Sequence, residues 1–472
     1  MAKATKKTAT TKSVVKKTAK KAAKKAAKKV APKGAPNTSA AKLNLTRDVQ
    51  RTVLENGVRV ISEKVSRATN AIFSVWVDAG SRFEDLNESG ATYLIQRAAL
   101  HGTEKRSQKV LAKHIDAMGG EVGFDTGRDY AHYFAACKSK TLGEAADIVA
   151  DIALRPRLDK DAISDESALL LEELREAETD ADHALDDMFL RSLWKGHGLC
   201  RPPHGRLLTV RGQTRLEDLR PKKLVRFHQM SHHPKALTIV ATGGVDHAEV
   251  LEICEKLFGG LEEPKKKAST TTPPTHRFLA LRNRPQFESA RFILGFPVCT
   301  ASDKLRHSAA IMNAVLTGGS DARLSKLIEN KKIAVDEVVS SLDLYADAGC
   351  LSIRVRVERE HAAQSLDTIV AELRRLPREP LDEKELRKYR DFCKVQLAAQ
   401  LDSLPSRTES LANAERYFGR VVDLEEDFAG LDAVTPEGLQ LLASNWITPY
   451  RLSLAVLGNL KGVNIRPNAL QW

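Results

Sequence analysis

The sequence predicts an α+β protein whose two halves repeat the same order of strands and helices. An extended pattern covers residues 53–80, where four apolar residues recur at the period of two that is typical of a strand: Ala71, Phe73, Val75 and Val77. Helical patterns follow, and after a polar segment the second half repeats this order in outline. At 472 residues the chain is long enough for two or more domains, each with an apolar core.

Two helices are predicted directly after the first strands. One covers residues 89–101 and is followed by Gly102, a residue type favoured just beyond a helix C-terminus. The next starts after Ser107, a suitable N-cap, and its apolar residues share one face: Leu111, Ile115 and Met118. A pair of glycines, Gly119 and Gly120, ends this helix. A strand over 129–137 and helical segments over 142–154 and 163–193 complete the first half.

The segment 261–277, which contains PKKKASTTTPPTH, has the composition of a linker. Beyond it we expect a strand over 292–297, then helices over 305–316 and 322–331 that are separated by a Gly-rich break. The repeated order indicates an internal duplication. The predicted boundaries are therefore a tail over 1–46, a first domain over 47–260, the linker, and a second domain over 278–472.

The net charge of +13 is concentrated in the tail. Residues 1–46 hold 14 of the 74 Lys and Arg residues and no Asp or Glu, which leaves 60 basic against 61 acidic residues from Arg47 onward. The tail can be interpreted as a mitochondrial presequence, as a linker-histone-like segment that binds polyanions, or as a disordered solubilising tail. The body lacks an excess of positive charge, so we do not expect nucleic acid as its partner.

Two further observations exclude whole classes of protein. No run of 18 apolar residues is present, so we expect no transmembrane span and any membrane association to come through partners. The six cysteines are widely spaced without a Cys-x-x-Cys pair, which argues against a zinc ribbon and against a disulfide framework.

Three segments carry a resemblance to a known family: VLENGVRVISEK, FSVWVDAGSRFED and GATYLIQRAALHGTEKRS. Together they resemble the N-terminal half of the pitrilysin/insulinase-like peptidases, especially the branch of mitochondrial processing peptidase and the complex III core proteins. The resemblance covers nearly all of residues 51–472. It implies two duplicated metallopeptidase-like domains, each a mainly antiparallel sheet flanked by helices.

The resemblance also implies that the zinc motif is degenerate. Active members carry His-x-x-Glu-His, because imidazoles at i and i+4 share a helix face and reach one Zn²⁺ while the Glu activates the bound water. In this chain Tyr93, Gln96 and Arg97 stand at those positions, whereas the distant ligand Glu173 and the accessory acid Glu166 are retained. A phenol is a poor ligand, an amide cannot accept a proton, and guanidinium is a permanent cation. We therefore expect neither bound metal nor peptidase activity.

Positions that contact substrate in the family differ as well. Gly123 stands where the family usually has an Asn on the strand that pairs with substrate. The Arg and Tyr that the family places seven residues apart in the second half are replaced by Glu329 and Asp336.

One hypothesis concerns Arg97 itself. If its side chain points as the lost ligand did, its guanidinium would form an ion pair with Glu173 and Glu166 where the metal used to lie. A fixed cation would then replace Zn²⁺ structurally.

The resemblance implies a non-catalytic core subunit of mitochondrial respiratory complex III, without a cofactor of its own. Its expected partners are a second core-type subunit and the cytochrome b, cytochrome c1 and Rieske iron–sulfur subunits, on the matrix side of the inner membrane. Two alternatives remain open. The chain could be a non-catalytic partner of a mitochondrial or bacterial processing peptidase, or a polyanion-binding protein that acts through its Lys-rich tail.

Overall fold

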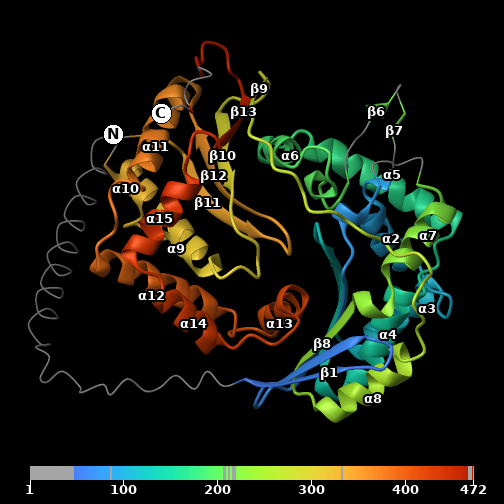
Figure 1. Cartoon of the computed structure of the whole chain (residues 1–472). Helices are drawn as coiled ribbons and strands as arrows, with labels where there is room; N and C mark the ends of the chain where they lie inside the picture. Colours follow the sequence, from blue (N-terminus) through green and yellow to red (C-terminus); the bar gives the residue numbers. More distant parts are fainter. Residues whose placement is uncertain are drawn as a thin grey trace, which may run out of the picture. The chain divides into compact units, whose positions relative to one another are not determined.

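A computed structural model describes residues 47–85, 88–205, 209–210, 213–214, 219–330, 333–465 and 470. The described residues belong to one compact unit. The three interpretations of the tail over 1–46 concern residues outside the described part of the chain. Figure 1 gives the labels of the helices and strands.

The first half contains a six-stranded sheet that is antiparallel except where β2 pairs with β8. Its strands, in spatial order, are β1 (Asp48–Val53), β2 (Arg59–Lys64), β8 (Leu237–Gly243), β3 (Asn70–Val77), β5 (Ala131–Lys138) and β4 (Glu121–Thr126). The last strand of this half in sequence, β8, thus lies at the centre of the sheet between β2 and β3. The sheet is therefore incomplete until the chain reaches residue 237.

The second half contains a five-stranded sheet that repeats this order. Its strands, in spatial order, are β9 (Leu279–Asn283), β13 (Ser453–Gly458), β10 (Ala290–Pro297), β12 (Gly349–Val357) and β11 (Glu337–Leu344). The single parallel pair, β9 with β13, occupies the place of β2 with β8. The predicted α+β class with two duplicated domains is therefore confirmed.

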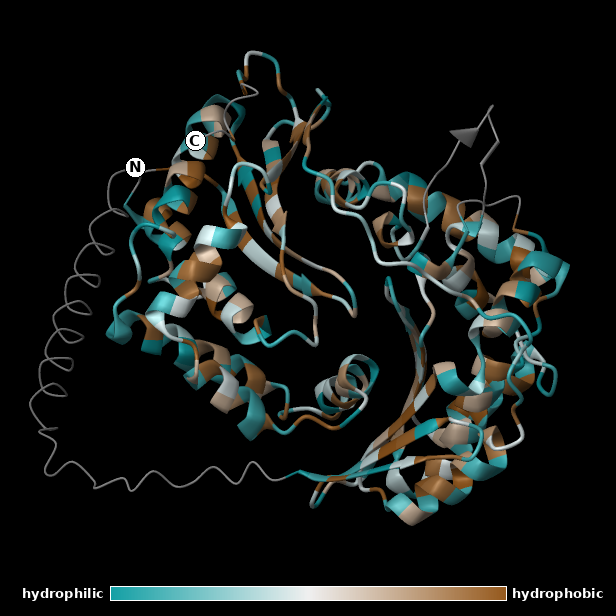
Figure 2. Cartoon of the chain, viewed as in Figure 1, coloured by the Kyte–Doolittle hydropathy of each residue, from teal (hydrophilic) through white to brown (hydrophobic). Residues whose placement is uncertain are grey.

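The helices follow the same order in both halves. The first half has α2 (Ala91–Ala99), α3 (Gln108–Met118), α4 (Leu142–Leu154), α5 (Lys160–Ala177), α6 (Ala181–Leu193), α7 (Pro221–Ser231) and α8 (His247–Phe258). The second has α9 (Arg306–Thr317), α10 (Arg323–Glu329), α11 (Ala362–Arg375), α12 (Glu383–Ala399), α13 (Leu404–Phe418), α14 (Leu424–Asp432) and α15 (Pro436–Trp446). Figure 2 shows hydrophobic and hydrophilic residues alternating along these helices, as expected where one helix face packs on a sheet.

One predicted helical segment is divided in the structure. The segment over 163–193 forms α5 and α6, with a break before Ala181. The carboxylate of Asp180 accepts a hydrogen bond from the backbone N–H of His183 at 2.7 Å and so caps a new helix. The break matters because α6 then packs against the other half.

Each half contributes one helix to the sheet of the other. Helix α6 contacts β10 and β13, and α13 contacts β3 and β8 (Figure 1). In the second of these contacts, Leu411 and Ala412 of α13 share a buried cluster with residues of the first sheet: Ile61, Trp76 and Val240. The two sheets are therefore each covered partly by a helix that is distant in sequence.

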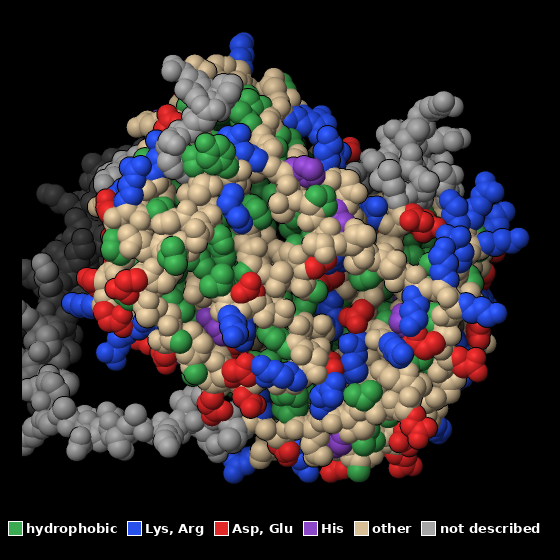
Figure 3. Space-filling view, in the orientation of Figure 1, with side chains coloured by type: hydrophobic (Ala, Val, Ile, Leu, Met, Phe, Trp, Pro, Cys, Tyr) green, Lys and Arg blue, Asp and Glu red, His purple; other side chains and the backbone are tan. Residues whose placement is uncertain are grey.

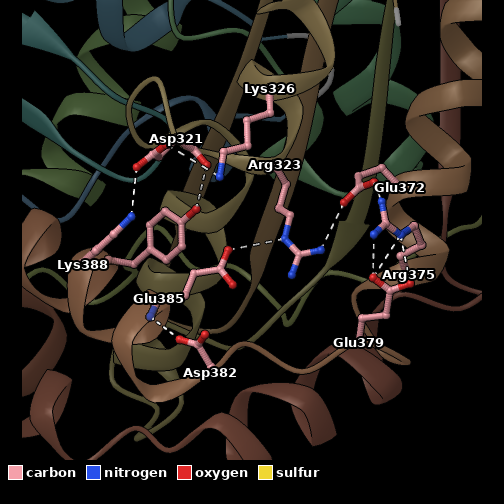
Figure 4. A network of polar contacts seen from close by, with 10 residues as sticks. Asp321, Arg323, Lys326, Glu372, Arg375, Glu379, Asp382, Glu385 and Lys388 are labelled. Carbon is pink, nitrogen blue, oxygen red and sulfur yellow. Dashed lines mark hydrogen bonds and ion pairs between the residues drawn. The ribbon is translucent and has the colours of Figure 1, made fainter. Parts of the chain in front are cut away.

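Equivalent places in the two halves also hold similar ion pairs. In the first half, Nη1 of Arg106 lies 2.5 Å from Oδ2 of Asp151, a fully buried residue of α4. In the second half, Nη1 of Arg323 lies 3.4 Å from Oε1 of Glu372 on α11, within the network of Figure 4. The duplication thus extends from strand order to individual buried contacts.

Across the described residues, no helix is both long and apolar enough to cross a membrane. No disulfide joins the six cysteines, all of which are described, and all except the half-buried Cys200 are buried.

Candidate functional site

The candidate site lies in the groove between α2 and α5. Helix α2 begins after Gly90, whose φ of 91° is in the left-handed region. The carboxylate of Glu84 accepts hydrogen bonds from the backbone N–H groups of Gly90 and Thr92, both at 2.8 Å. Glu84 is buried, and burial raises its pKa to about 7 against these hydrogen bonds. This cap fixes the start of the helix that carries the degenerate motif.

The side chain of Arg97 fills the groove. Its Nη1 lies 2.6 Å from Oε1 and 2.7 Å from Oε2 of Glu173, and its Nε donates to Oε2 of Glu166. The side chains of Arg97 and Glu166 are only 15% and 11% exposed, whereas that of Glu173 is 48% exposed. The predicted ion pair with both carboxylates is therefore confirmed.

The electrostatics of the groove favour the charged forms. Burial lowers the pKa of Arg97, but hydrogen bonds with Glu173 and Glu166 outweigh burial and leave that pKa above its ordinary value. Burial likewise raises the pKa of Glu166, but the bonds from Arg97 and His101 hold it below its ordinary value. The groove therefore contains a stable cation–carboxylate cluster.

Two aromatic side chains extend this cluster. Nε2 of His101 lies 2.7 Å from Oε1 of Glu166, the oxygen that Arg97 leaves free. The hydroxyl of Tyr93 lies 3.4 Å from Nη1 of Arg97, whose guanidinium carbon is 5.5 Å from the centre of the phenol ring. His101 was not predicted as a site residue, although its i+4 spacing from Arg97 was a usable signal.

Gln96, the residue before Arg97, points to the sheet and is fully buried. Its amide N–H groups donate to the backbone carbonyls of Asp125 at 3.2 Å and His132 at 3.0 Å, and its carbonyl accepts from the hydroxyl of Thr126. A carboxylate at this position could not make the two donor contacts. Gln96 therefore connects α2 to the ends of β4 and β5.

Gly123 lies on the edge strand β4, opposite Phe134 of β5. A Cβ atom at this position would lie 2.6 Å from the ring of Phe134, so a side chain could enter only if that ring moved. The aromatic ring thus covers the space where an Asn would project.

The remaining predicted residues lie in the second half. Glu329 is the last residue of α10 and Asp336 directly precedes β11; both are exposed. The structure therefore brings Tyr93, Arg97, Glu166 and Glu173 together, whereas Glu329 and Asp336 occupy exposed positions of the second half.

These residues do not fit a zinc ion. Both retained carboxylates are hydrogen-bonded to a guanidinium, which is a permanent cation and cannot act as a ligand. Within the described part of the chain, no group of three His, Cys, Asp or Glu residues is arranged to hold a metal. The charge-assisted hydrogen bonds of Arg97 with Glu166 and Glu173 therefore hold α2 against α5.

Two family models match the chain. Residues 59–204 match the model described as Insulinase (Peptidase family M16), and residues 218–392 match the one described as Peptidase M16 inactive domain. An uncharacterized zinc protease from Mycobacterium leprae is 28% identical over 428 residues, which are 90% of this chain and 94% of the relative. Mouse mitochondrial-processing peptidase subunit beta is 26% identical, with 88% of this chain and 85% of the relative covered.

Two solved structures share the fold. A protease from Helicobacter pylori matches with a TM-score of 0.79 and 18% identity, over 87% of this chain and 99% of that one. A chain of complex III2 from Candida albicans matches with a TM-score of 0.76 and 16% identity, over 89% and 98%. With both family models matched in sequence and the duplicated sheets in place, the chain belongs to the insulinase-like peptidase family M16.

Proposed function

We propose that this chain is a non-catalytic M16 subunit that pairs with a second M16 chain carrying an intact His-x-x-Glu-His motif. The observation that carries the proposal is the contact of Arg97 with Glu166 and Glu173. A chain without a base at position 96 and without two of its metal ligands has only its scaffold to contribute.

Similarity to known proteins sets the order in which we propose the two assemblies. The resemblance of the motifs to complex III core proteins placed that assembly first, and the matching fold of the Candida complex III chain supports it. The identity of 28% to the Mycobacterium leprae zinc protease, over 90% of this chain, is higher than the 16% to the Candida complex III chain. This difference favours an active peptidase as the partner. We therefore place the peptidase partner first and a core subunit of mitochondrial complex III second, with the respiratory subunits as its neighbours.

The polyanion-binding alternative rests on the tail alone. Figure 3 shows Lys and Arg interspersed with Asp and Glu over much of the face that it displays. Salt-sensitive DNA binding that persists after residues 1–46 are deleted would contradict our proposal for the body.

Inactivity is tested on the purified chain by measuring bound zinc and the cleavage of a quenched fluorescent peptide. We expect neither stoichiometric zinc nor cleavage. The matched variant is Tyr93→His/Gln96→Glu/Arg97→His, which restores the ligand types and should raise zinc content above that of the wild type. Stoichiometric zinc together with cleavage by the wild-type chain would overturn the proposal.

Pairing is tested by affinity purification from the native source under mild conditions, followed by mass spectrometry. Recovery of an M16 chain with an intact motif supports the first assembly, and recovery of haem-containing membrane subunits supports the second. Recovery of this chain without any M16 partner, at concentrations where complexes persist, would contradict both.

A further inference from the structure

A polar cavity lies at one end of the second sheet, where the segment 261–277 reaches it. Because β10 is antiparallel to both β12 and β13, the end of β10 meets the beginnings of the other two strands. Residues 275–277 complete a cavity of about 430 Å³ at this place. Its volume is within the range of roughly 300–1,000 Å³ that is typical of small-molecule sites.

Arg451, in the loop before β13, lines this cavity. Its Nη2 donates to the backbone carbonyl of Pro297 at 2.6 Å, whereas its buried Nε has no hydrogen-bond partner among the described residues. Burial lowers the pKa of Arg451. Arg97 and Arg106 are partly buried too, but hydrogen bonds with carboxylates raise their pKa values above the ordinary value. Arg451 is therefore a half-buried cation for which the described residues supply no carboxylate.

Further donors line the same cavity. Arg277 is exposed and forms no ion pair with another described residue. Thr275 and Thr300 line the cavity as well, and each adds a hydroxyl to the wall. A guanidinium presents five N–H donors in one plane, an arrangement that matches the oxygens of a phosphate or a carboxylate. The wall is therefore suited to an oxyanion.

Two acids also line the cavity, but they do not cancel its positive charge. The carboxylate of Asp347 accepts two hydrogen bonds from Nη2 of Arg82, at 2.8 and 3.0 Å, so the first half of the chain neutralises it. Asp303 remains, and its Oδ1 accepts the backbone N–H of Leu305 at 2.9 Å. Arg277 and Arg451 thus face one carboxylate that has no cationic partner among the described residues. This excess of positive charge favours an anionic ligand.

We propose that this cavity binds the phosphate group of a small ligand, with the guanidiniums of Arg451 and Arg277 as its main partners. A phosphate monoester has three terminal oxygens, so it can accept from two guanidiniums and a hydroxyl at once, whereas a carboxylate has only two oxygens. Tyr450 lines the cavity and is 87% exposed, so its ring is available to cover an organic group on the phosphate. The site shares no lining residue with the ion-paired groove, so it is independent of the proposed pairing.

The test uses the whole purified chain and isothermal titration calorimetry with phenyl phosphate and with inorganic phosphate, at constant ionic strength. Arg451→Met removes the half-buried guanidinium, and Arg277→Gln removes an exposed one that makes no contact on which folding depends. The matched control is Arg378→Gln, which removes the same charge from an exposed side chain outside the cavity. Benzoate is the control ligand, because it carries the same ring on a carboxylate.

We expect saturable binding of phenyl phosphate, weakened at least about tenfold by Arg451→Met and several-fold by Arg277→Gln, with Arg378→Gln within about twofold of the wild type. If Arg451→Met fails to fold, Arg277→Gln still decides. Both sources of the phosphate group agree with the proposal: tighter binding of phenyl phosphate than of inorganic phosphate identifies an organic phosphate, and equal binding identifies the free ion.

Three results would overturn the proposal. The first is that neither phosphate binds saturably at millimolar concentrations. The second is that Arg277→Gln weakens binding no more than Arg378→Gln does, which would reduce the effect to net charge. The third is that benzoate binds as tightly as phenyl phosphate, which would assign the cavity to carboxylates instead.

Discussion

The groove between α2 and α5 and the groove between α9 and α12 have the same place in a duplicated fold but different contents. In the first half, one guanidinium and two carboxylates fill the space. In the second half, apolar side chains and carboxamides surround a cavity of about 720 Å³. The surrounding strand order is the same, so the fold alone does not determine what the groove contains.

The difference shows how a scaffold can keep its packing after its chemistry has changed. The retained acids Glu166 and Glu173 would repel each other if no cation lay between them. Arg97 supplies that cation, and it also packs against the ring of Tyr93. Among the described residues that line the second groove, the acids are Glu409 and Asp427, and Asp427 is paired with Arg306 and His307 at the wall.

The largest expected effect is the loss of the cation in the first groove. Arg97→Leu leaves the mostly buried Glu166 with His101 at 2.7 Å as its remaining partner, and we expect the free energy of unfolding to fall by about 2–3 kcal/mol. The value is below that of a fully buried pair because Glu173 is 48% exposed. Urea denaturation followed by circular dichroism measures it.

The control for this variant is Arg97→Leu/Glu166→Gln/Glu173→Gln, which removes the unpaired charges and should recover at least half of the loss. A loss below about 0.5 kcal/mol in the single variant would show that Arg97 does not hold the groove together.

A smaller effect is expected where the two halves have equivalent ion pairs. Arg106→Met leaves the fully buried Asp151 with Arg155 at 3.2 Å and the Thr103 hydroxyl at 2.5 Å, and we expect a loss of about 1–2 kcal/mol. Arg323→Met leaves Glu372 with Arg375 at 2.8 Å, and we expect about 0.5–1 kcal/mol. Paired urea titrations compare the two; a larger loss for Arg323→Met would contradict this order.

The pH dependence of the first groove should follow from Glu166. Its pKa in the folded chain is lowered, so its contribution to stability is present above the unfolded value of about 4.3 and is lost as pH falls through the folded value. The stability difference between the wild type and Arg97→Leu should therefore shrink as pH falls below about 4.5. Thermal melts from pH 7 to pH 3 test this, and a difference that grows in acid would contradict it.

The smallest effect is expected in the second groove. Asn313→Leu replaces a side chain whose buried Oδ1 has no hydrogen-bond partner among the described residues, so the free energy of unfolding should change by less than about 0.5 kcal/mol or rise slightly. The same urea titration gives the value. A loss as large as that of Arg97→Leu would show that this carboxamide is part of the packing.

Much of the fold was predictable from local patterns. The helix over 142–154 has those bounds in the structure, and Ser107 and Gly119 mark the ends of α3 as expected. The segment over 163–193 was harder, because the amphipathic pattern continues past the break at Asp180. Its two parts pack in different places, and helical periodicity does not report which sheet a helix covers.

The site was predictable in part. The spacing of Tyr93 and Arg97 placed them on one helix face, and the distant Glu166 and Glu173 came from the family resemblance. The contribution of Glu84 was missed, because a cap from an upstream loop has no fixed spacing from the helix that it caps. The contribution of His101 was missed although this residue lies four positions after Arg97. The domain boundaries stay a prediction.

The sequence by itself determined the α+β class, the duplication and the chemical reason why a zinc ion does not fit, because these depend on periodicity and on residue type. Only the tertiary structure decided that α6 and α13 cover the sheets of opposite halves. It also decided that Gln96 bonds to β4 and β5 and that the second groove remains open. Those features depend on contacts between residues far apart in the chain, and a local sequence pattern does not show which distant residues come into contact.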